Sequence, residues 1–282
     1  IDRKAFSECS CLTELYIPSN VVTIDDEAFD ACNKLKYIHV AEDNPNYVSV
    51  DGILFTKDLT KLIVYPAQKQ DRYYEVPDTV KQMSWGAFEG NAHLEEVVIG
   101  CGLSKIPMAA FRECTSLVTV KLPDSLREIE PHAFCKCRNL KNINIPENVR
   151  SVGLAFWYCE SLEEITLPKG LIQFTGGEFH YCNRLQKIHV DPENPHFESE
   201  DGVVFTKGKR VLVSYPGGKE DPIYCVPHSV RKFEQLSFYG CQHLRAVRIL
   251  DGVKEGNLPE IRCSTFVKCP KLATITFVNH RF

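Results

Sequence analysis

Cysteine is the residue type that most directly suggests chemistry in this chain of 282 residues, because 13 cysteines are present. A thiolate can bind zinc, attack an electrophile or enter a disulfide. Eight of the cysteines recur at one fixed place, three residues after a phenylalanine: Cys9, Cys32, Cys114, Cys137, Cys159, Cys182, Cys241 and Cys269. This regular recurrence predicts a column of small, buried, reduced thiols that pack as apolar side chains.

Metal binding and disulfide formation are the alternatives for these thiols. Cys9-x-Cys11 and Cys135-x-Cys137 could each supply two zinc ligands. A structural zinc site needs four converging donors, and the two pairs lie far apart in the chain. Neighbouring column cysteines would be close enough for a disulfide, but their side chains should point in parallel rather than at each other. We therefore expect no metal, no cofactor and mostly free thiols.

Catalysis by a cysteine–histidine pair is the remaining chemical interpretation. The nine histidines are scattered, and the sequence contains no nucleophile elbow, phosphate-binding loop or HExxH zinc motif. Gly176-Gly177 and Gly217-Gly218 lack the strand–helix context of a phosphate loop. The chain is therefore not expected to be an enzyme, although spacing alone leaves open a Cys–His pair assembled by the fold.

The column cysteines belong to a repeat that is clearest in Phe111-x-x-Cys114-x-x-Leu117-x-x-Val120-x-Leu122-Pro123-x-x-Leu126-x-x-Ile129. Five of the eight intervals between successive repeat phenylalanines are 22 or 23 residues: Phe6, Phe29, Phe88, Phe111, Phe134, Phe156, Phe179, Phe238 and Phe266. This period and the L-x-x-I-x-I spacing are typical of a leucine-rich repeat, in which each turn adds one strand to a shared sheet.

Two longer intervals of 59 residues contain the same inserted segment, near residues 41–76 and 191–226, with an offset of 150. In the first copy, two apolar runs flank the polar segment 57–61, which predicts a β-hairpin over Ile53–Tyr65. The second copy predicts the same hairpin over Val203–Tyr215. We expect an internal duplication, with each hairpin carried on a single solenoid domain that spans residues 1–282.

Within a regular turn, side chains of a strand alternate between the two faces of the sheet. Val120 and Leu122 are expected to point into the core, while Thr119 and Lys121 face solvent. Pro123 ends the strand because it has no N–H to donate. The fold class expected from these patterns is mostly β: a right-handed leucine-rich repeat solenoid with a parallel sheet and two inserted β-hairpins.

The recurring run Ala-Phe-x-x-Cys-x-x-Leu-x-x-Ile-x-Ile-Pro resembles the BspA-like leucine-rich repeat family, and the Asn-Pro-x-Tyr…Asp-Gly segment resembles its embedded hairpin. The resemblance covers almost the whole chain. It implies a surface or secreted protein of bacteria or some protists that adheres to host or matrix proteins. Three departures, at Asn91, Gly177-Glu178 and Thr265, are expected to concern packing.

The solvent side of the sheet is the predicted binding face. Its candidate residues are Tyr16, Tyr37, His39, Lys121, Asn142, Asn144, Glu164, Lys187, His189 and Arg248. Tyrosine and arginine dominate binding hot spots, so the two tyrosines and Arg248 are the expected anchors. An ordinary solvated face is the alternative, and the mixed charges favour no ligand type.

Composition narrows the classes of partner. There are 37 acidic and 33 basic residues, a net charge of -4, which gives no basic field for nucleic acid. No apolar run approaches the roughly 18 residues of a membrane helix, so no membrane insertion is expected. The leading expectation, implied by the family resemblance, is a non-catalytic protein-binding or adhesion module of a bacterial cell-surface or secreted protein, with a host or matrix protein as partner and a glycan as the alternative. An intracellular scaffold is the runner-up, because free thiols suit a reducing compartment.

The ends of the sequence suggest a fragment. Residues 1–6 match the middle of a repeat, so missing targeting signals say little about location. The last strand carries Leu272, Ile275 and Phe277 with no polar cap, which predicts self-association through uncapped ends.

Overall fold

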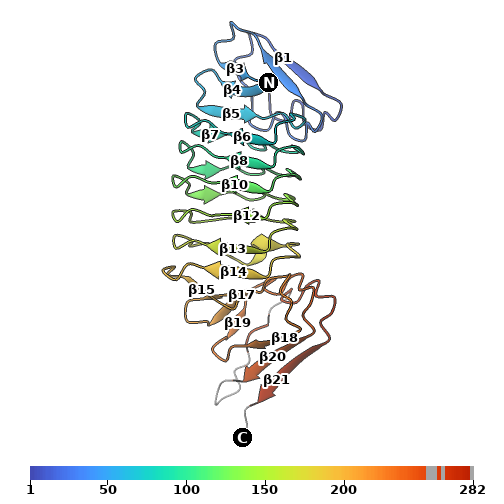
Figure 1. The fold of residues 1–282 in the computed structure, drawn as a ribbon, viewed down its shortest axis with the longest axis vertical. Helices are drawn as coiled ribbons and strands as arrows, with labels where there is room; N and C mark the ends of the chain where they lie inside the picture. The colour runs from blue at the N-terminus through green and yellow to red at the C-terminus, as the bar shows by residue number, and fades with distance from the viewer. Residues whose placement is uncertain (252–258, 262–263, 280–282) are drawn as a thin grey trace.

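The protein is an elongated stack of short turns in the computed structural model, which describes residues 1–251, 259–261 and 264–279. Strands run across the long axis, and β1 and β21 lie at opposite ends of the stack (Figure 1). The only helical segment in the described chain is the single turn η1 (Gly177–Phe179). The structure is thus nearly all β, as the repeat predicts.

One side of the stack is the parallel front sheet. Equivalent residues of successive turns are paired, as Thr119 is with Glu96 on one side and Asn142 on the other. The front strands are β1 (Glu14–Ile17), β2 (Tyr37–Val40), β6 (Tyr73–Glu75), β8 (Glu96–Val98), β10 (Thr119–Lys121), β12 (Asn142–Ile143), β13 (Glu164–Leu167), β14 (Lys187–Val190), β18 (Ile223–Val226), β20 (Ala246–Asp251) and β21 (Thr274–Asn279). These pairings confirm a β-solenoid of stacked parallel strands.

The other sides of each turn repeat in the same register. A side ladder pairs the very short parallel strands β9 (Lys105–Ile106) and β11 (Glu128–Ile129). The equivalent strands β7 (Gln82–Met83) and β19 (Lys232–Phe233) each pair with a strand of an inserted segment instead. At the corner between this ladder and the front sheet, the Phe111 N–H donates to the Ala133 carbonyl at 2.8 Å. The rings of Phe111 and Phe134 stack with centroids 5.4 Å apart. The repeat phenylalanines therefore form a stacked column inside the solenoid.

Each insertion forms a three-stranded antiparallel sheet. In the first, β3 (Tyr47–Val50) pairs with β4 (Ile53–Thr56), which pairs with β5 (Lys61–Val64). In the second, β15 (Phe197–Glu200), β16 (Val203–Thr206) and β17 (Val211–Ser214) pair in the same order. The two predicted hairpins, β4–β5 and β16–β17, are confirmed. Each is extended by one earlier strand of the chain, β3 or β15.

These antiparallel sheets lie between turns of the solenoid rather than on its surface. Figure 1 shows β4 and β5 between β1 and β8 along the axis. Leu54 and Ile63 pack into the N-terminal core, whereas Ile53, Phe55 and Leu62 pack into the central core. The second insertion likewise separates the central core from a C-terminal one. Each inserted sheet is therefore part of the stack itself. A strand buried on both faces needs a continuous apolar run, as residues 53–55 provide.

Each insertion also supplies one complete turn to the phenylalanine column. Tyr65 lies 23 residues before Phe88, and its N–H donates to the Ala87 carbonyl at 2.7 Å. Its ring stacks on Phe88 at 4.9 Å, and Tyr215 stacks on Phe238 at 5.1 Å. Each 59-residue interval is therefore one long turn with extra strands followed by one regular turn.

The insertions interrupt the front sheet, which the sequence predicted to be continuous. The Ile38 N–H of β2 donates to the Gly52 carbonyl at 3.1 Å, and the Ile188 N–H of β14 donates to the Gly202 carbonyl at 3.0 Å. Each of these carbonyls takes the hydrogen bond that the next front strand would accept in an uninterrupted sheet. A further gap separates β12 from β13, so the front strands form four parallel groups.

The apolar side of β21 is exposed among the described residues, with Ile275 37% and Phe277 47% accessible. Self-association through this edge stays a prediction.

Candidate functional site

The outward side chains of the front strands form the candidate binding face. Val120 and Ile165 are 2% and 3% exposed and point into the core, as alternation requires. All ten candidate residues on the opposite side are exposed, and Tyr16 is 63% and Tyr37 38% accessible. Their exposure makes contact with a partner feasible, and their role in binding stays a prediction.

The structure divides the ten candidates into separate groups. The first group holds Tyr16, Tyr37 and His39 on β1 and β2, where Tyr16 and His39 occupy paired positions. Lys121, Asn142 and Asn144 form the second group, and Glu164, Lys187 and His189 the third, on β13 and β14. Arg248 is on β20, beyond the second insertion. The candidates therefore do not form one unbroken row.

Tyr37 is tied to the first insertion as well as being exposed. Its ring lies 4.4 Å from that of His39. It also covers Gly52, where an added Cβ would lie 2.6 Å from the ring and the backbone φ is +78°. Only glycine fits this place without strain. The orientation of Tyr37 is consequently fixed before any partner binds.

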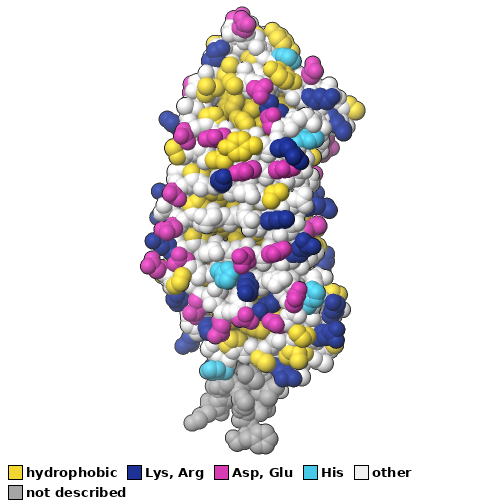
Figure 2. Space-filling view, in the orientation of Figure 1, with side chains coloured by type: hydrophobic (Ala, Val, Ile, Leu, Met, Phe, Trp, Pro, Cys, Tyr) yellow, Lys and Arg dark blue, Asp and Glu magenta, His cyan; other side chains and the backbone are white. Residues whose placement is uncertain are grey.

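Ion pairs across neighbouring strands give the face a mixed charge. The Lys121 ammonium lies 2.7 Å from the Glu96 carboxylate, and the Glu164 carboxylate lies 3.5 Å from the His189 imidazole. A hydrogen bond to Glu96 raises the pKa of Lys121 above its ordinary value. Figure 2 shows acidic and basic side chains interspersed along the length of the molecule. The face has no field of one sign that would select a highly charged partner.

A groove of about 490 Å³ lies where β12 and β13 are not paired. Three of the ten candidates line it, namely Asn142, Glu164 and Lys187, together with Lys141 and Glu163. Its lining is polar and carries both charges. Of the candidate face, this groove is the part that is recessed enough to hold side chains of a partner.

Sequence reasoning missed four outward residues because it counted the segments of two further front strands as the ends of the insertions at 41–76 and 191–226. Tyr73 and Glu75 project from β6, and Ile223 and Cys225 project from β18. Tyr73 is 51% exposed and Ile223 is 45% exposed. The available signal was the apolar residue followed by proline that ends the front strands: Ile17-Pro18, Val76-Pro77 and Val226-Pro227.

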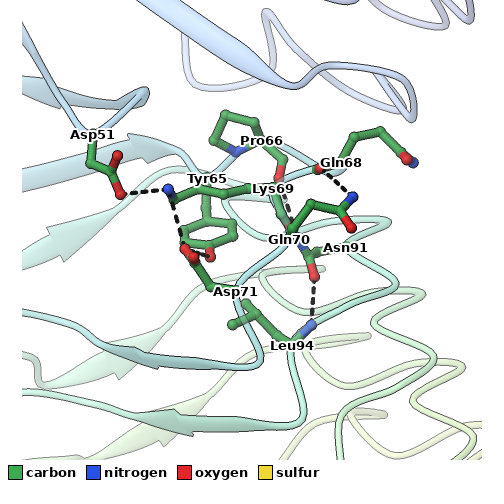
Figure 3. A network of polar contacts seen from close by, with 9 residues as sticks. All are labelled: Asp51, Tyr65, Pro66, Gln68, Lys69, Gln70, Asp71, Asn91 and Leu94. Carbon is green, nitrogen blue, oxygen red and sulfur yellow. Dashed lines mark hydrogen bonds and ion pairs between the residues drawn. The ribbon is translucent and has the colours of Figure 1, made fainter.

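A partly buried lysine of the first insertion binds two aspartates and so links separate segments of the chain. Figure 3 shows the Lys69 ammonium between the carboxylates of Asp51 and Asp71, at 2.6 and 3.2 Å. The Tyr65 hydroxyl also donates to Asp71 at 2.8 Å. Burial works to lower the pKa of Lys69, but its bonds to the two carboxylates outweigh it and raise that pKa. The arrangement is that of a structural clamp.

The second insertion repeats the lysine–aspartate contacts of this clamp, whereas the buried hydroxyl of Tyr215 has no hydrogen-bond partner among the described residues. The Lys219 ammonium lies 2.8 Å from Asp201 and 2.9 Å from Asp221, and the residue is only 7% exposed. Two copies of the same clamp at the same place in the fold indicate that the fold itself requires it.

Asn91 replaces a column cysteine for a structural reason. Its side-chain amide donates to the carbonyls of Pro66 and Lys69, at 3.2 and 3.1 Å, and its carbonyl accepts the Leu94 N–H at 2.8 Å (Figure 3). A thiol could not span two carbonyls and an amide. Pro66 and Lys69 follow Tyr65 at the start of the turn that precedes Asn91, and their carbonyls are the groups that Asn91 binds.

All twelve described cysteines are free, and six of the eight column cysteines are buried. Among the described residues, no group of three or more His, Cys, Asp or Glu side chains could hold a metal ion. No helix in the described ranges is long and apolar enough to cross a membrane.

The sequence matches the family model described as "BspA type Leucine rich repeat region" in six copies, over residues 1–63, 75–200 and 224–281. None of the curated proteins matches the chain.

Solved structures of bacterial leucine-rich repeat proteins are similar in fold. The pneumococcal vaccine antigen PcpA is 25% identical, with a TM-score of 0.63 over 96% of this chain and 56% of its own. A leucine-rich cell surface protein from Faecalibacterium prausnitzii is 24% identical, with a TM-score of 0.55 over 98% of this chain and 63% of its own. A leucine-rich repeat protein from Eubacterium ventriosum is 18% identical, with a TM-score of 0.62 over 83% and 71% of the two chains. The present chain thus spans less than two thirds of the length of the first two.

Proposed function

The chain belongs to the BspA type leucine-rich repeat family, and from this premise we propose that it is a non-catalytic binding module of a bacterial cell-surface or secreted protein. The proposed partner is a host or matrix protein, bound by the front face. The similar Faecalibacterium protein is described as a cell surface protein and the pneumococcal protein as a vaccine antigen, which supports this location.

The observation that carries the proposal is the outward presentation of all ten candidate side chains on or beside the front strands. Their backbones are held by the parallel ladder and by the packed core beneath it. A partner would therefore bind without first ordering the backbone, which reduces the entropic cost of association. The groove between β12 and β13 offers the recessed centre that buried hot spots need, with the exposed tyrosines as outlying anchors.

An intracellular protein-binding scaffold is the second candidate. It is favoured by the twelve free cysteines, because reduced thiols persist in a reducing compartment. Both candidates use the same face, and they differ in the compartment from which the partner comes.

The experiment is to measure binding of the chain to immobilised fibronectin, laminin and collagen by surface plasmon resonance. Replacing Glu164 and Lys187 together by alanine, or Tyr16 by serine, should weaken binding about tenfold, or about 1.4 kcal/mol. Val22→Ser is the matched control, since Val22 is 62% exposed but lies outside the front strands. Unchanged binding by both front-face variants would contradict the proposal.

A failure to bind any of the three matrix proteins would remove the extracellular version. Capture from a bacterial cytosolic lysate that the Glu164/Lys187 variant abolishes and Val22→Ser does not would then support the scaffold.

A further inference from the structure

A cavity of about 350 Å³ lies beside η1, away from the front strands. Its walls come from three parts of the chain: residues 154–157, 174–180 and 234–236. The first two precede the second insertion and the third follows it. The solenoid fold therefore brings together side chains that are about eighty positions apart in the sequence.

The cavity lies at a turn that departs from the repeat. Regular turns have alanine before the column phenylalanine, as at Ala110 and Ala133, but this turn has Glu178. The Glu178 side chain is buried, with 3% of the residue exposed, and accepts the N–H and hydroxyl of Thr175 at 2.9 and 3.0 Å. In the described chain, η1 occurs at this turn alone. The backbone of this turn thus differs from that of the neighbouring turns, and the cavity lies beside the part that differs.

Aromatic side chains that are already held in place form the apolar wall. The Trp157 indole N–H donates to the Gly177 carbonyl at 2.7 Å. The His180 ring is stacked between Trp157 and Tyr239, at centroid distances of 5.3 and 4.0 Å. Phe174 and Leu236 complete this side of the cavity. The wall is preorganised, so a ligand would not have to order it.

The opposite side of the cavity is lined by polar side chains that are either neutral or paired with an opposite charge. Thr175 and Gln235 are exposed, and the Gln235 amide has no hydrogen-bond partner in the described part of the chain. The Glu234 carboxylate lies 3.0 Å from the Lys232 ammonium, which balances its charge. The buried His180 Nε2 also has no partner among the described residues. The cavity therefore offers hydrogen bonds without an excess charge.

The first copy of the duplicated segment shows that the solenoid does not require this lining. At the positions 150 residues earlier, Ser7, Asp30 and Ser84 occupy the places of Trp157, His180 and Glu234. The same strands and the same clamp form around both sets of residues. The aromatic pair Trp157 and His180 therefore occurs in the second copy and not at the equivalent positions of the first.

We propose that this cavity binds one or two rings of a neutral saccharide. A sugar ring has C–H faces that pack against aromatic side chains such as Trp157, and hydroxyls that hydrogen-bond to groups such as Gln235 and Glu234. The cavity volume is at the lower end of the range of about 300–1,000 Å³ for small-ligand sites. This site is separate from the front face, so it adds a second recognition surface to the proposed protein-binding function.

Trp157 itself can report binding. The chain has two tryptophans, so Trp85→Phe leaves Trp157 as the single tryptophan, which can be excited selectively over the tyrosines. Titration of this variant with maltose, lactose, cellobiose and chitobiose should give a saturable change in emission for at least one sugar, with Kd about 1 mM or tighter. A neutral oligosaccharide array identifies the preferred sugar.

Gln235→Ala in the same background should weaken this binding at least about fivefold through the lost amide hydrogen bonds. Gln186→Ala is the matched control, an exposed amide at the front-face groove, and should leave the saccharide Kd unchanged.

No change in Trp157 emission with any neutral saccharide at about 10 mM would overturn the proposal. So would equal affinity in the Gln235→Ala variant, binding of anionic saccharides only, or saturation by a proline-rich peptide in place of a sugar. None of these outcomes bears on binding of a protein by the front face, which is tested by the Glu164/Lys187 variant.

Discussion

The thiol of Cys137 donates a hydrogen bond to the carbonyl oxygen of Phe111, one turn earlier in the solenoid, at 3.0 Å. The same contact links Cys114 to Phe88 at 3.1 Å and Cys182 to Phe156 at 3.1 Å. Each column cysteine of the central stack thus joins two turns while it fills a small apolar space. The column is a structural ladder of thiols.

Native thiol labelling should separate the column from the surface. Burial raises the pKa of Cys182 to about 12, so this thiol is both inaccessible and protonated at neutral pH. Cys11 and Cys225 are exposed and should react within minutes, with exposed Cys101 slower because its hydrogen bond with Asp78 raises its pKa. Mass spectrometry of labelled peptides measures this order. Rapid native labelling of Cys137 or Cys182 would refute the ladder.

Restoring the repeat cysteine at Asn91 should destabilise the protein. Asn91→Cys removes bonds to the Pro66 and Lys69 carbonyls and to the Leu94 N–H. The expected loss is about 2–4 kcal/mol, because buried backbone groups are left unsatisfied. Urea unfolding measures it. Asn148→Cys, at an exposed asparagine whose side chain donates to the Asp124 carbonyl at 3.2 Å, should cost less than about 1 kcal/mol.

The buried Lys219 clamp of the second insertion should contribute more to the free energy of unfolding than an exposed lysine that also contacts two carboxylates. Lys219→Met leaves Asp201 and Asp221 without their cation and should cost about 1–3 kcal/mol. Lys169→Met breaks contacts to Glu147 and Glu193, at 3.1 and 3.6 Å, but Lys169 is exposed. This control should change stability by less than about 0.5 kcal/mol. Equal losses in thermal unfolding would contradict a structural role for the buried clamp.

A glycine should be favourable two residues after a column phenylalanine. The residue two positions after each described repeat phenylalanine has a positive φ, including 56° at Ala31 and 74° at Gly90. Ala31→Gly should stabilise the protein by about 0.5–1 kcal/mol, because it relieves left-handed backbone strain that exceeds the entropy lost from glycine.

The reverse change provides the control for that prediction. Gly90→Ala should destabilise the protein, since its Cβ would lie 2.4 Å from the Asn33 side-chain oxygen. Differential scanning calorimetry of both variants checks the pair of opposite signs. A lower Tm for Ala31→Gly would count against the strain argument.

His180 should make the protein less stable in acid. Burial lowers the pKa of this imidazole to about 4, against about 6.5 in the unfolded chain. Between these two values the unfolded state binds the additional proton, so stability falls as pH drops from 6.5 towards 4. The contribution is about 1–3 kcal/mol at full extent.

His180→Phe keeps a ring between Trp157 and Tyr239 and removes the titrating group. The difference in unfolding free energy between the variant and the wild type should therefore grow in favour of the variant below pH 6.5. A difference that is constant from pH 4 to 7.5 would show that His180 is not protonated on unfolding.

The fold class, the column of phenylalanines and thiols, and the face of each regular strand followed from the sequence alone. The physical reason is that side chains alternate along a strand at every residue, and a 23-residue period places equivalent residues of successive turns side by side. Lys121 and Val120 could thus be assigned to opposite faces from local pattern, and both assignments hold. The thiol hydrogen bonds to phenylalanine carbonyls required the structure, since spacing does not show what a thiol contacts.

Only the tertiary structure shows which segments the two insertions pair with and pack against. Ile38 could have donated its N–H to the next front strand or to Gly52, and no local pattern distinguishes these two long-range pairings. The outcome places β4 and β5 between two cores, divides the front face, and brings residues 154–157 next to residues 234–236. A repeat predicts contacts between successive turns, whereas the cavity depends on how the chain passes around an inserted sheet.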